Sequence, residues 1–126
     1  MSSGFEAIVW KENKIVLLDQ TQIPISETYI SYDELAPYID AIQRLVVRGA
    51  PALGVAGAYG VVLVIDEAAR KGHSAQELEH NLDLLRDARP TAVNLAWAVE
   101  KIRKHLTEGR DAVLAAAHQL ASEDKQ

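Results

Sequence analysis

The fold is decided by one long apolar stretch, residues 47–72, which reads VRGAPALGVAGAYGVVLVIDEAARKG. Pro51 suits the first position of a helix, because its missing N–H would have no partner there in any case. Gly72 directly follows two basic residues, an arrangement typical of a helix C-terminus. We therefore predict one long helix over residues 51–71.

Three glycines interrupt this predicted helix. Gly54, Gly57 and Gly60 recur every three residues, and each costs about 1 kcal/mol relative to alanine in an isolated helix. Close approach of another backbone is the usual compensation, and Ala50, Gly54 and Ala58 form a stripe of small residues. The spacing differs from the dinucleotide-binding fingerprint, and no strand leads directly into it. We predict a tightly packed central helix rather than a cofactor cradle.

The residues before this stretch predict a small sheet. Apolar runs at 8–10 and 15–18 flank the polar turn Lys11-Glu12-Asn13-Lys14, which is a hairpin signature. Residues 27–30 predict a third short strand after Pro24, a residue that interrupts strand pairing. We therefore expect a small antiparallel β-meander over residues 1–30.

The remaining sequence has helical periodicity. Ser31-Tyr32-Asp33-Glu34 and Ser74-Ala75-Gln76-Glu77 both fit a capping box. The first box predicts a helix from residue 31, although Pro37 allows a start near residue 38. Further helices are predicted from residue 74 to about 86, from 90 to before Gly109, and from 111 to about 122. The fold class is therefore α+β: a small N-terminal antiparallel β-meander followed by an α-helical bundle over 31–122, in a single domain of residues 1–126.

Two expectations concern the predicted helix from residue 90. Trp97 lies at helical spacing with Val93 and is predicted to be in the core. Lys101, Arg103 and Lys104 are predicted to form a solvated face.

The composition excludes several classes of site. The chain has 126 residues and no Cys, which rules out disulfides, thiolate zinc sites, iron–sulfur clusters and a Cys nucleophile within it. Its four His residues, at 73, 80, 105 and 118, lack ligand spacing, so no metal is expected. A net charge of −5 argues weakly against nucleic-acid binding. No signal peptide or membrane-length apolar run is recognised, so a cytoplasmic protein is expected.

The first segment with chemical potential lies at the start of the long helix. The amides of Gly49 and Ala50 stand at the helix entrance, where free N–H groups and the helix dipole attract an anion. Arg48 adds a planar guanidinium that can hold two phosphate oxygens at once. We predict a phosphate site at Arg48, Gly49 and Ala50, supported by Pro51. The alternative is an ordinary loop whose arginine pairs with a carboxylate.

The second segment is Asp87-Ala88-Arg89-Pro90-Thr91-Ala92-Val93-Asn94-Leu95. It again places an arginine and a proline before a helix, with Thr91 as a predicted cap and Asn94 as an amide donor or brace. Arg89 and Arg48 could therefore converge on one anion. The alternative is that Arg89 pairs with Asp87 or another carboxylate.

These motifs resemble a known family. The strings Leu18-Asp19-Gln20, Ile23-Pro24, Val47-Arg48-Gly49-Ala50-Pro51-Ala52-Leu53-Gly54, Ala58-Tyr59-Gly60 and Ala88-Arg89-Pro90-Thr91-Ala92-Val93-Asn94-Leu95 resemble methylthioribose-1-phosphate isomerases. That family shares a superfamily with ribose-1,5-bisphosphate isomerase and the regulatory subunits of translation initiation factor 2B. The resemblance covers nearly the whole chain.

The resemblance implies an aldose–ketose isomerisation in methionine salvage, from 5-methylthioribose 1-phosphate to 5-methylthioribulose 1-phosphate. It implies that Arg48, Gly49, Ala50 and Arg89 contact the substrate, chiefly its phosphate. No cofactor or metal is implied. The implied partners are the sugar phosphate and the catalytic domain of the same enzyme, with a homodimer as a further option and with no nucleic acid and no membrane.

The chain also departs from the family pattern. The family's catalytic Cys and Asp belong to a C-terminal Rossmann-like domain, so no catalytic residue is expected in this chain. The resemblance therefore implies that the chain is the N-terminal domain alone, through truncation, a split gene or deliberate shortening. This domain should not turn over substrate by itself. Two alternatives are a regulatory or assembly module of the initiation-factor branch and a helical scaffold that binds nothing small.

Overall fold

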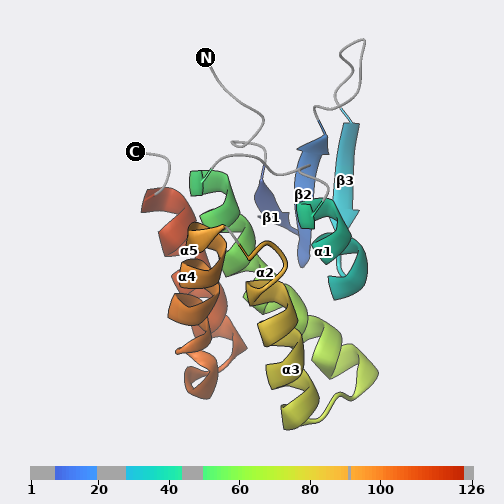
Figure 1. The fold of residues 1–126 in the computed structure, drawn as a ribbon. Helices are drawn as coiled ribbons and strands as arrows, with labels where there is room; N and C mark the ends of the chain where they lie inside the picture. The colour runs from blue at the N-terminus through green and yellow to red at the C-terminus, as the bar shows by residue number, and fades with distance from the viewer. Residues whose placement is uncertain (1–7, 20–27, 44–49, 91, 124–126) are drawn as a thin grey trace.

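The computed structural model describes residues 8–19, 28–43, 50–90 and 92–123. It begins with an antiparallel sheet in the order β1 (Val9–Lys11), β2 (Lys14–Asp19) and β3 (Thr28–Tyr32) (Figure 1). Glu12 and Asn13 join the first two strands with φ angles of 54° and 64°. Positive φ at both central residues matches the twist of a tight hairpin. Because neighbouring strands pair antiparallel in the order β1-β2-β3, the predicted β-meander is confirmed.

The boundary between sheet and bundle differs from the prediction at Ser31. β3 continues through Ser31 to Tyr32, and α1 (Leu35–Gln43) begins at Leu35, so the capping box predicted at Ser31 is wrong. The Leu35 N–H instead donates to Glu67 Oε1 at 2.8 Å, from the far end of the next helix. Pro37 lies within the first turn of α1, where no helical N–H bond is lost.

The long helix α2 (Ala50–Lys71) forms the centre of the molecule, and Gly72 follows it with a φ of 71°, as the sequence predicted. Every residue from 53 to 64 is buried, because β2, α1, α3, α4 and α5 all pack around this helix. A Cβ at Gly57 would lie 3.0 Å from the Leu95 carbonyl oxygen, and one at Gly60 would lie 2.7 Å from Leu85 Cδ2. The predicted close approach of another backbone is confirmed at Gly57, whereas at Gly60 the close neighbours are the side chains of Leu85 and Tyr38.

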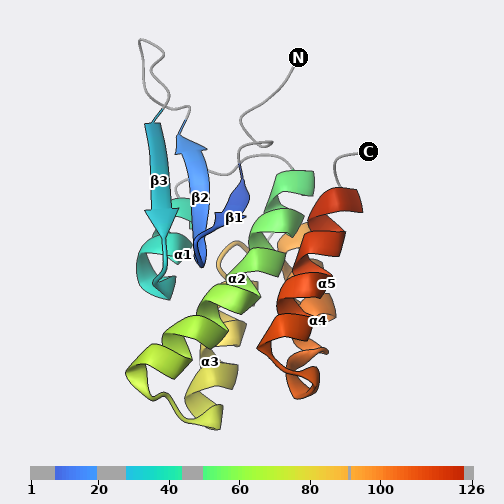
Figure 2. The same cartoon turned by 180° about the vertical axis from the view of Figure 1, so that it is seen from behind.

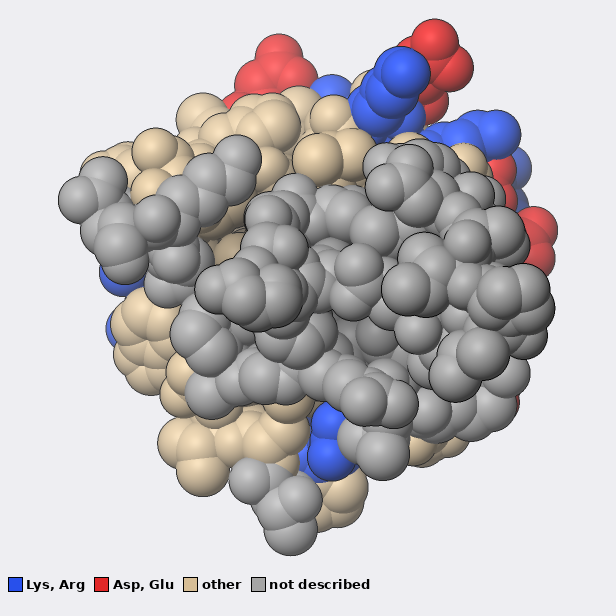
Figure 3. All heavy atoms as spheres, turned by 90° about the horizontal axis from the view of Figure 1, so that it is seen from above, with Lys and Arg blue, Asp and Glu red and all other residues tan. Residues whose placement is uncertain are grey.

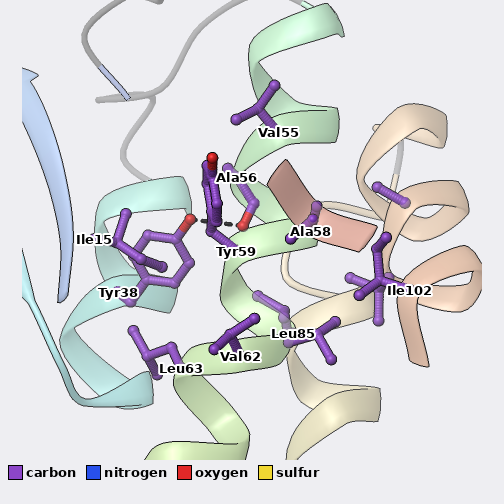
Figure 4. Packing of buried hydrophobic residues seen from close by; sticks show 14 of the residues in the cluster. Ile15, Tyr38, Val55, Ala56, Ala58, Tyr59, Val62, Leu63, Leu85 and Ile102 are labelled. Carbon is purple, nitrogen blue, oxygen red and sulfur yellow. Dashed lines mark hydrogen bonds between the residues drawn. The ribbon is translucent and has the colours of Figure 1, made fainter. Parts of the chain in front are cut away.

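The buried side chains around α2 come from all parts of the fold (Figure 4). Tyr38 of α1 is fully buried, and its hydroxyl donates to the Ala56 carbonyl oxygen at 2.7 Å. Burial raises the pKa of Tyr38 far above its usual range, since the ionised form would lose water. Because a buried hydroxyl needs a partner, this bond ties α1 to the middle of α2.

The other helices are α3 (Ala75–Arg86), α4 (Val93–Arg103), the short 3₁₀ helix η2 (Leu106–Glu108) and α5 (Arg110–Glu123). The capping box at Ser74 and Glu77 is present, with each side chain bonded to the other residue's backbone N–H. The predicted helix from 90 to 108 is shorter than expected, because α4 begins at Val93 and a turn separates it from η2.

Two side chains of α4 contradict the sequence prediction. Trp97 is 52% exposed rather than buried in the core. Arg103 is not part of a solvated face, since its side chain is only 14% exposed and binds Asp83, Glu100 and Glu79. The core face of α4 is formed by Leu95, Ala98, Val99 and Ile102, so both Trp97 and Arg103 lie beside that stripe rather than in it.

Arg110, the first residue of α5, joins the sheet to the bundle. Its guanidinium donates to both carboxylate oxygens of Asp66 and to Asn13 Oδ1, each at 2.9 Å. Its guanidinium carbon also lies 5.9 Å from the centre of the Trp10 ring. Trp10 in turn stacks on Tyr59 of α2, so the β-hairpin is held against α2 and α5.

Candidate functional site

Both predicted phosphate-binding segments lead into helices that start at the same end of the bundle. α2 and α4 run in the same direction, and α5 ends at that end too (Figures 1 and 2). Gly57, two turns into α2, packs against Leu95 in the first turn of α4. At 1.5 Å per residue, Gly57 is seven residues from the start of α2 and Leu95 two residues from the start of α4, so α2 begins about 8 Å beyond the level at which α4 begins.

The first segment is only partly within the described residues. Ala50 is the first residue of α2 and Pro51 the second, which places the helix entrance one residue earlier than predicted. Arg48 and Gly49 lie outside the described residues, so their predicted phosphate contacts stay predictions. The first turn of any α-helix has N–H groups without partners inside the helix, and such groups can attract an anion.

The second segment adopts a turn before its helix. The Ala92 N–H donates to the Arg89 carbonyl oxygen at 2.8 Å, which closes a turn with Pro90 at its second position. Ala92 is the N-cap of α4 and makes no side-chain capping bond, because alanine has no polar side-chain atom. Thr91 itself lies outside the described residues. Asn94 is exposed in the first turn of α4, where its amide can brace a ligand or the loop.

The side chain of Arg89 has no hydrogen bond or ion pair to any other residue that the structure describes. The predicted alternative, a pair with Asp87, is wrong, because Arg86 binds both oxygens of Asp87 at 2.9 and 3.0 Å. These hydrogen bonds from Arg86 lower the pKa of the Asp87 carboxyl. The guanidinium of Arg89 is half-buried and therefore available to an anion from outside the described residues.

The other described arginines differ from Arg89 in this respect. Arg70 donates to the Asp33 carbonyl oxygen, while Arg86, Arg103 and Arg110 each bind at least one carboxylate. Hydrogen bonds that Arg86 donates to Asp87 and Glu100 raise the pKa of Arg86 above its ordinary value. Such pairs fix these side chains in structural roles.

Figure 3 shows the molecule from the end at which α2 and α4 start. Acidic side chains of the described residues appear only along the upper and right-hand edges of this view, while basic ones also reach the opposite edges.

No group of three or more His, Asp or Glu within the described residues could hold a metal ion. No helix in the described part of the chain is long and apolar enough to cross a membrane.

The sequence reasoning missed an exposed apolar stripe next to Arg89. Val93 is 75% exposed and Trp97 52% exposed, and Lys101 Nζ lies 4.9 Å from the centre of the Trp97 ring. The signal was present in the sequence: residues 93, 97, 101 and 104 share one helix face, and the last two are lysines. A face that ends in two lysines points to solvent or to a partner, not to the core.

Residues 46–126 match the sequence profile of the Initiation factor 2 subunit family. The chain belongs to this family. Its curated relatives include "Methylthioribose-1-phosphate isomerase 2" of Pseudothermotoga lettingae, 44% identical over 102 residues, and "Methylthioribose-1-phosphate isomerase" of Geobacter metallireducens, 36% identical over 131 residues. These matches cover 81% and 96% of this chain, but only 30% and 38% of the relatives. The chain thus spans about a third of the length of these curated relatives.

Two solved structures share the fold of this family member. The crystal structure of the translation initiation factor eIF-2B, subunit delta, from A. fulgidus has a TM-score of 0.77 and 37% identity, covering 93% of this chain and 36% of that one. The 5-methylthioribose 1-phosphate isomerase from Pyrococcus horikoshii OT3 has a TM-score of 0.71 and 25% identity, covering 94% of this chain and 35% of that one. The family resemblance inferred from the motifs is therefore confirmed.

Proposed function

We propose that this chain is the phosphate-binding N-terminal part of a methylthioribose-1-phosphate isomerase. The observation that carries the proposal is the guanidinium of Arg89, which is half-buried, bound to no other described residue and placed just before a helix that starts beside α2. The curated relatives are named as isomerases of methylthioribose 1-phosphate, and the family resemblance implies 5-methylthioribulose 1-phosphate as the product.

The proposed role follows from the chemistry of the substrate. A phosphate on the anomeric carbon blocks simple opening of the sugar ring, so the enzyme has to hold an opened or opening sugar phosphate. A planar guanidinium binds two phosphate oxygens, and amides at a helix start add further donors. We assign phosphate contact to Arg48, Gly49, Ala50 and Arg89, and support to Pro51, Thr91 and Asn94.

The reacting groups come from elsewhere in this proposal. The chain has no Cys, and in this proposal the catalytic Cys and Asp implied by the resemblance lie in the part of the longer relatives that this chain does not cover. The domain would close over the sugar phosphate, orient it and exclude water, and it would be inactive alone.

A chimera tests the proposal. The chain replaces the matching segment of the Geobacter metallireducens isomerase, and conversion of 5-methylthioribose 1-phosphate is measured. We expect turnover in the chimera and none in the 126-residue chain alone. Arg89→Ala should lower kcat/KM on the order of 100-fold, the effect of removing one charge-assisted contact to phosphate.

The matched control is Arg70→Ala, which removes the same side chain at the other end of α2, where it binds the Asp33 carbonyl oxygen. It should leave kcat/KM within about twofold of the chimera, since it lies outside the proposed site. Equal losses in both variants, or none in Arg89→Ala, would overturn the phosphate role. Inorganic phosphate added to the 126-residue chain should shift the backbone amide signals of Ala50 and Asn94, a readout independent of the chimera.

The solved A. fulgidus structure favours a second candidate, a regulatory or assembly module that makes protein–protein contacts. This reading predicts a stable complex with a translation factor, no amide shifts with sugar phosphates and an inactive but folded chimera. The uncommitted guanidinium of Arg89 weighs against it, because a protein contact does not require a free anion-binding group there.

A further inference from the structure

The exposed stripe on α4, formed by Val93 and Trp97, has no partner in the described structure. These residues lie one turn apart on the side of the helix opposite to its buried face. α4 already packs against α2, α3 and α5 through its other faces, so the packing of this domain does not require the stripe. Tryptophan is one of the residue types most enriched at the centres of protein interfaces.

The charges around this stripe are arranged for a contact. Glu100, the nearest acidic residue along the helix, is already bound by both Arg86 and Arg103. Lys101 lies over the Trp97 ring and is itself exposed. The surface thus has an apolar centre with a basic rim, which fits a partner surface with an apolar patch and an acidic edge.

A second apolar surface provides a comparison. An open groove of about 540 Å³ lies between α1 and α3, with Leu35, Ile39 and Leu84 in its lining and Leu84 44% exposed. Its polar lining includes Glu67, whose two carboxylate oxygens are both used inside the domain. This groove lies away from Arg89, and its apolar side chains are less exposed than Val93.

We propose that the α4 stripe, Val93 and Trp97, is the surface on which the remaining part of the longer isomerase docks. This proposal rests on the proposed function. The curated relatives are about three times as long as this chain, so each of them has a larger body outside the matched segment that could cover the stripe. The stripe directly follows the turn that carries Arg89, so a body docked on Val93 would also cover that guanidinium. Docking and phosphate enclosure would then be one event.

Thiol labelling tests the docking surface, because the chain has no Cys and any introduced thiol is unique in it. Val93→Cys is made in the 126-residue chain and in the Geobacter chimera. The rate of N-ethylmaleimide addition is read on the peptide containing residue 93 by mass spectrometry. We expect labelling to be at least 10-fold slower in the chimera than in the chain alone.

The matched control is Leu84→Cys, an exposed apolar position in the groove between α1 and α3. Its labelling rate should be the same in both proteins. Protection at residue 84 with none at residue 93 would place the docking surface in the groove and overturn the proposal. Protection of residue 93 in the isolated chain, together with a concentration-dependent dimer, would show a second copy on the stripe and also overturn it.

The labelling experiment and the activity of the chimera test the two proposals independently. Protection at residue 93 in an inactive chimera would support the docking surface and contradict the isomerase function. An active chimera with equal labelling rates at residue 93 would support the function and contradict the docking surface.

Discussion

The two ends of α2 differ in how their polar groups are used. At the end where α2 stops, Lys71 binds Glu67, Arg70 binds the Asp33 carbonyl oxygen, and Ser74 caps the next helix together with Glu77. At the other end, Arg89 binds no other described residue and Val93 is 75% exposed. The closed end serves the stability of the domain. The open end keeps polar and apolar groups available for something outside it.

The comparison predicts that close helix packing, rather than ion pairing, stabilises the region near the open end. Gly57→Val should therefore have the largest effect. Its side chain would collide with the Leu95 carbonyl oxygen and Val99, which are 3.0 and 3.3 Å from a Cβ, and a backbone oxygen yields little. We expect a loss of about 3 kcal/mol in the free energy of unfolding, measured by urea denaturation.

Ala69→Val is the control for this prediction, because Ala69 is exposed on the same helix. Its cost should stay within about 0.5 kcal/mol. If Gly57→Val cost no more than the control, the two helices would not depend on close approach at this point.

The second prediction separates stability from binding by comparing two arginines. Arg103→Ala removes hydrogen bonds to Asp83 and Glu100 of 2.9 and 3.2 Å from a side chain that is only 14% exposed. It should cost about 2 kcal/mol in unfolding free energy and leave the phosphate-induced amide shifts intact. Arg89→Ala should do the opposite, abolishing the shifts with little change in stability. Unfolding and titration of both variants check this, and a stability loss in Arg89→Ala as large as that in Arg103→Ala would erase the contrast between the two ends.

The third and smallest effect concerns Glu67 at the closed end. Burial raises the pKa of this carboxyl, but the hydrogen bonds from Lys71 and from the Leu35 N–H outweigh it and hold the pKa below its ordinary value of 4.5. A depressed folded-state pKa contributes stability above pH 4.5, and that contribution is lost as the pH falls through the folded value. Glu67→Gln should therefore cost about 1 kcal/mol at pH 7, and the difference from the unmodified chain should shrink below pH 4.5.

Glu34→Gln serves as its control, since Glu34 is exposed and lies 3.8 Å from the same lysine without capping α1. Its stability at pH 7 should barely change. A difference between the Glu67→Gln variant and the unmodified chain that stayed constant from pH 7 to pH 3 would show that the charge on Glu67 contributes nothing.

The two predicted capping boxes show what the sequence can and cannot foretell. At Ser74, the hydroxyl and Glu77 find their partners within three residues, so a local pattern was sufficient. At Ser31, the same pattern failed, because pairing with Val16 extends the strand through that residue. The amide that needed a cap belongs to Leu35 and is bonded 32 residues away. A local motif carries no information about such a distant partner.

The candidate site shows the same division. The start of α2 near Pro51 and its end before Gly72 followed from helix rules, because both depend on neighbours along the chain. The exposure of Trp97 did not follow, because the orientation of α4 is set by its contact with Gly57 of α2. Because that contact fixes the side of α4 that carries Leu95 toward α2, position 97 faces outward and the N-cap falls on Ala92.

The clasp made by Arg110 has a consequence for how the chain assembles. Its side chain binds Asn13 in the β-hairpin, which lies 97 residues earlier in the sequence, and also Asp66 in the central helix. During synthesis, the hairpin is made first, but its turn gains this anchor only after residue 110 has emerged. The part of the protein that is made first therefore gains one of its stabilising contacts last. A nascent chain that stalls before Arg110 would lack the hydrogen bond that joins the amino-terminal sheet to the helices.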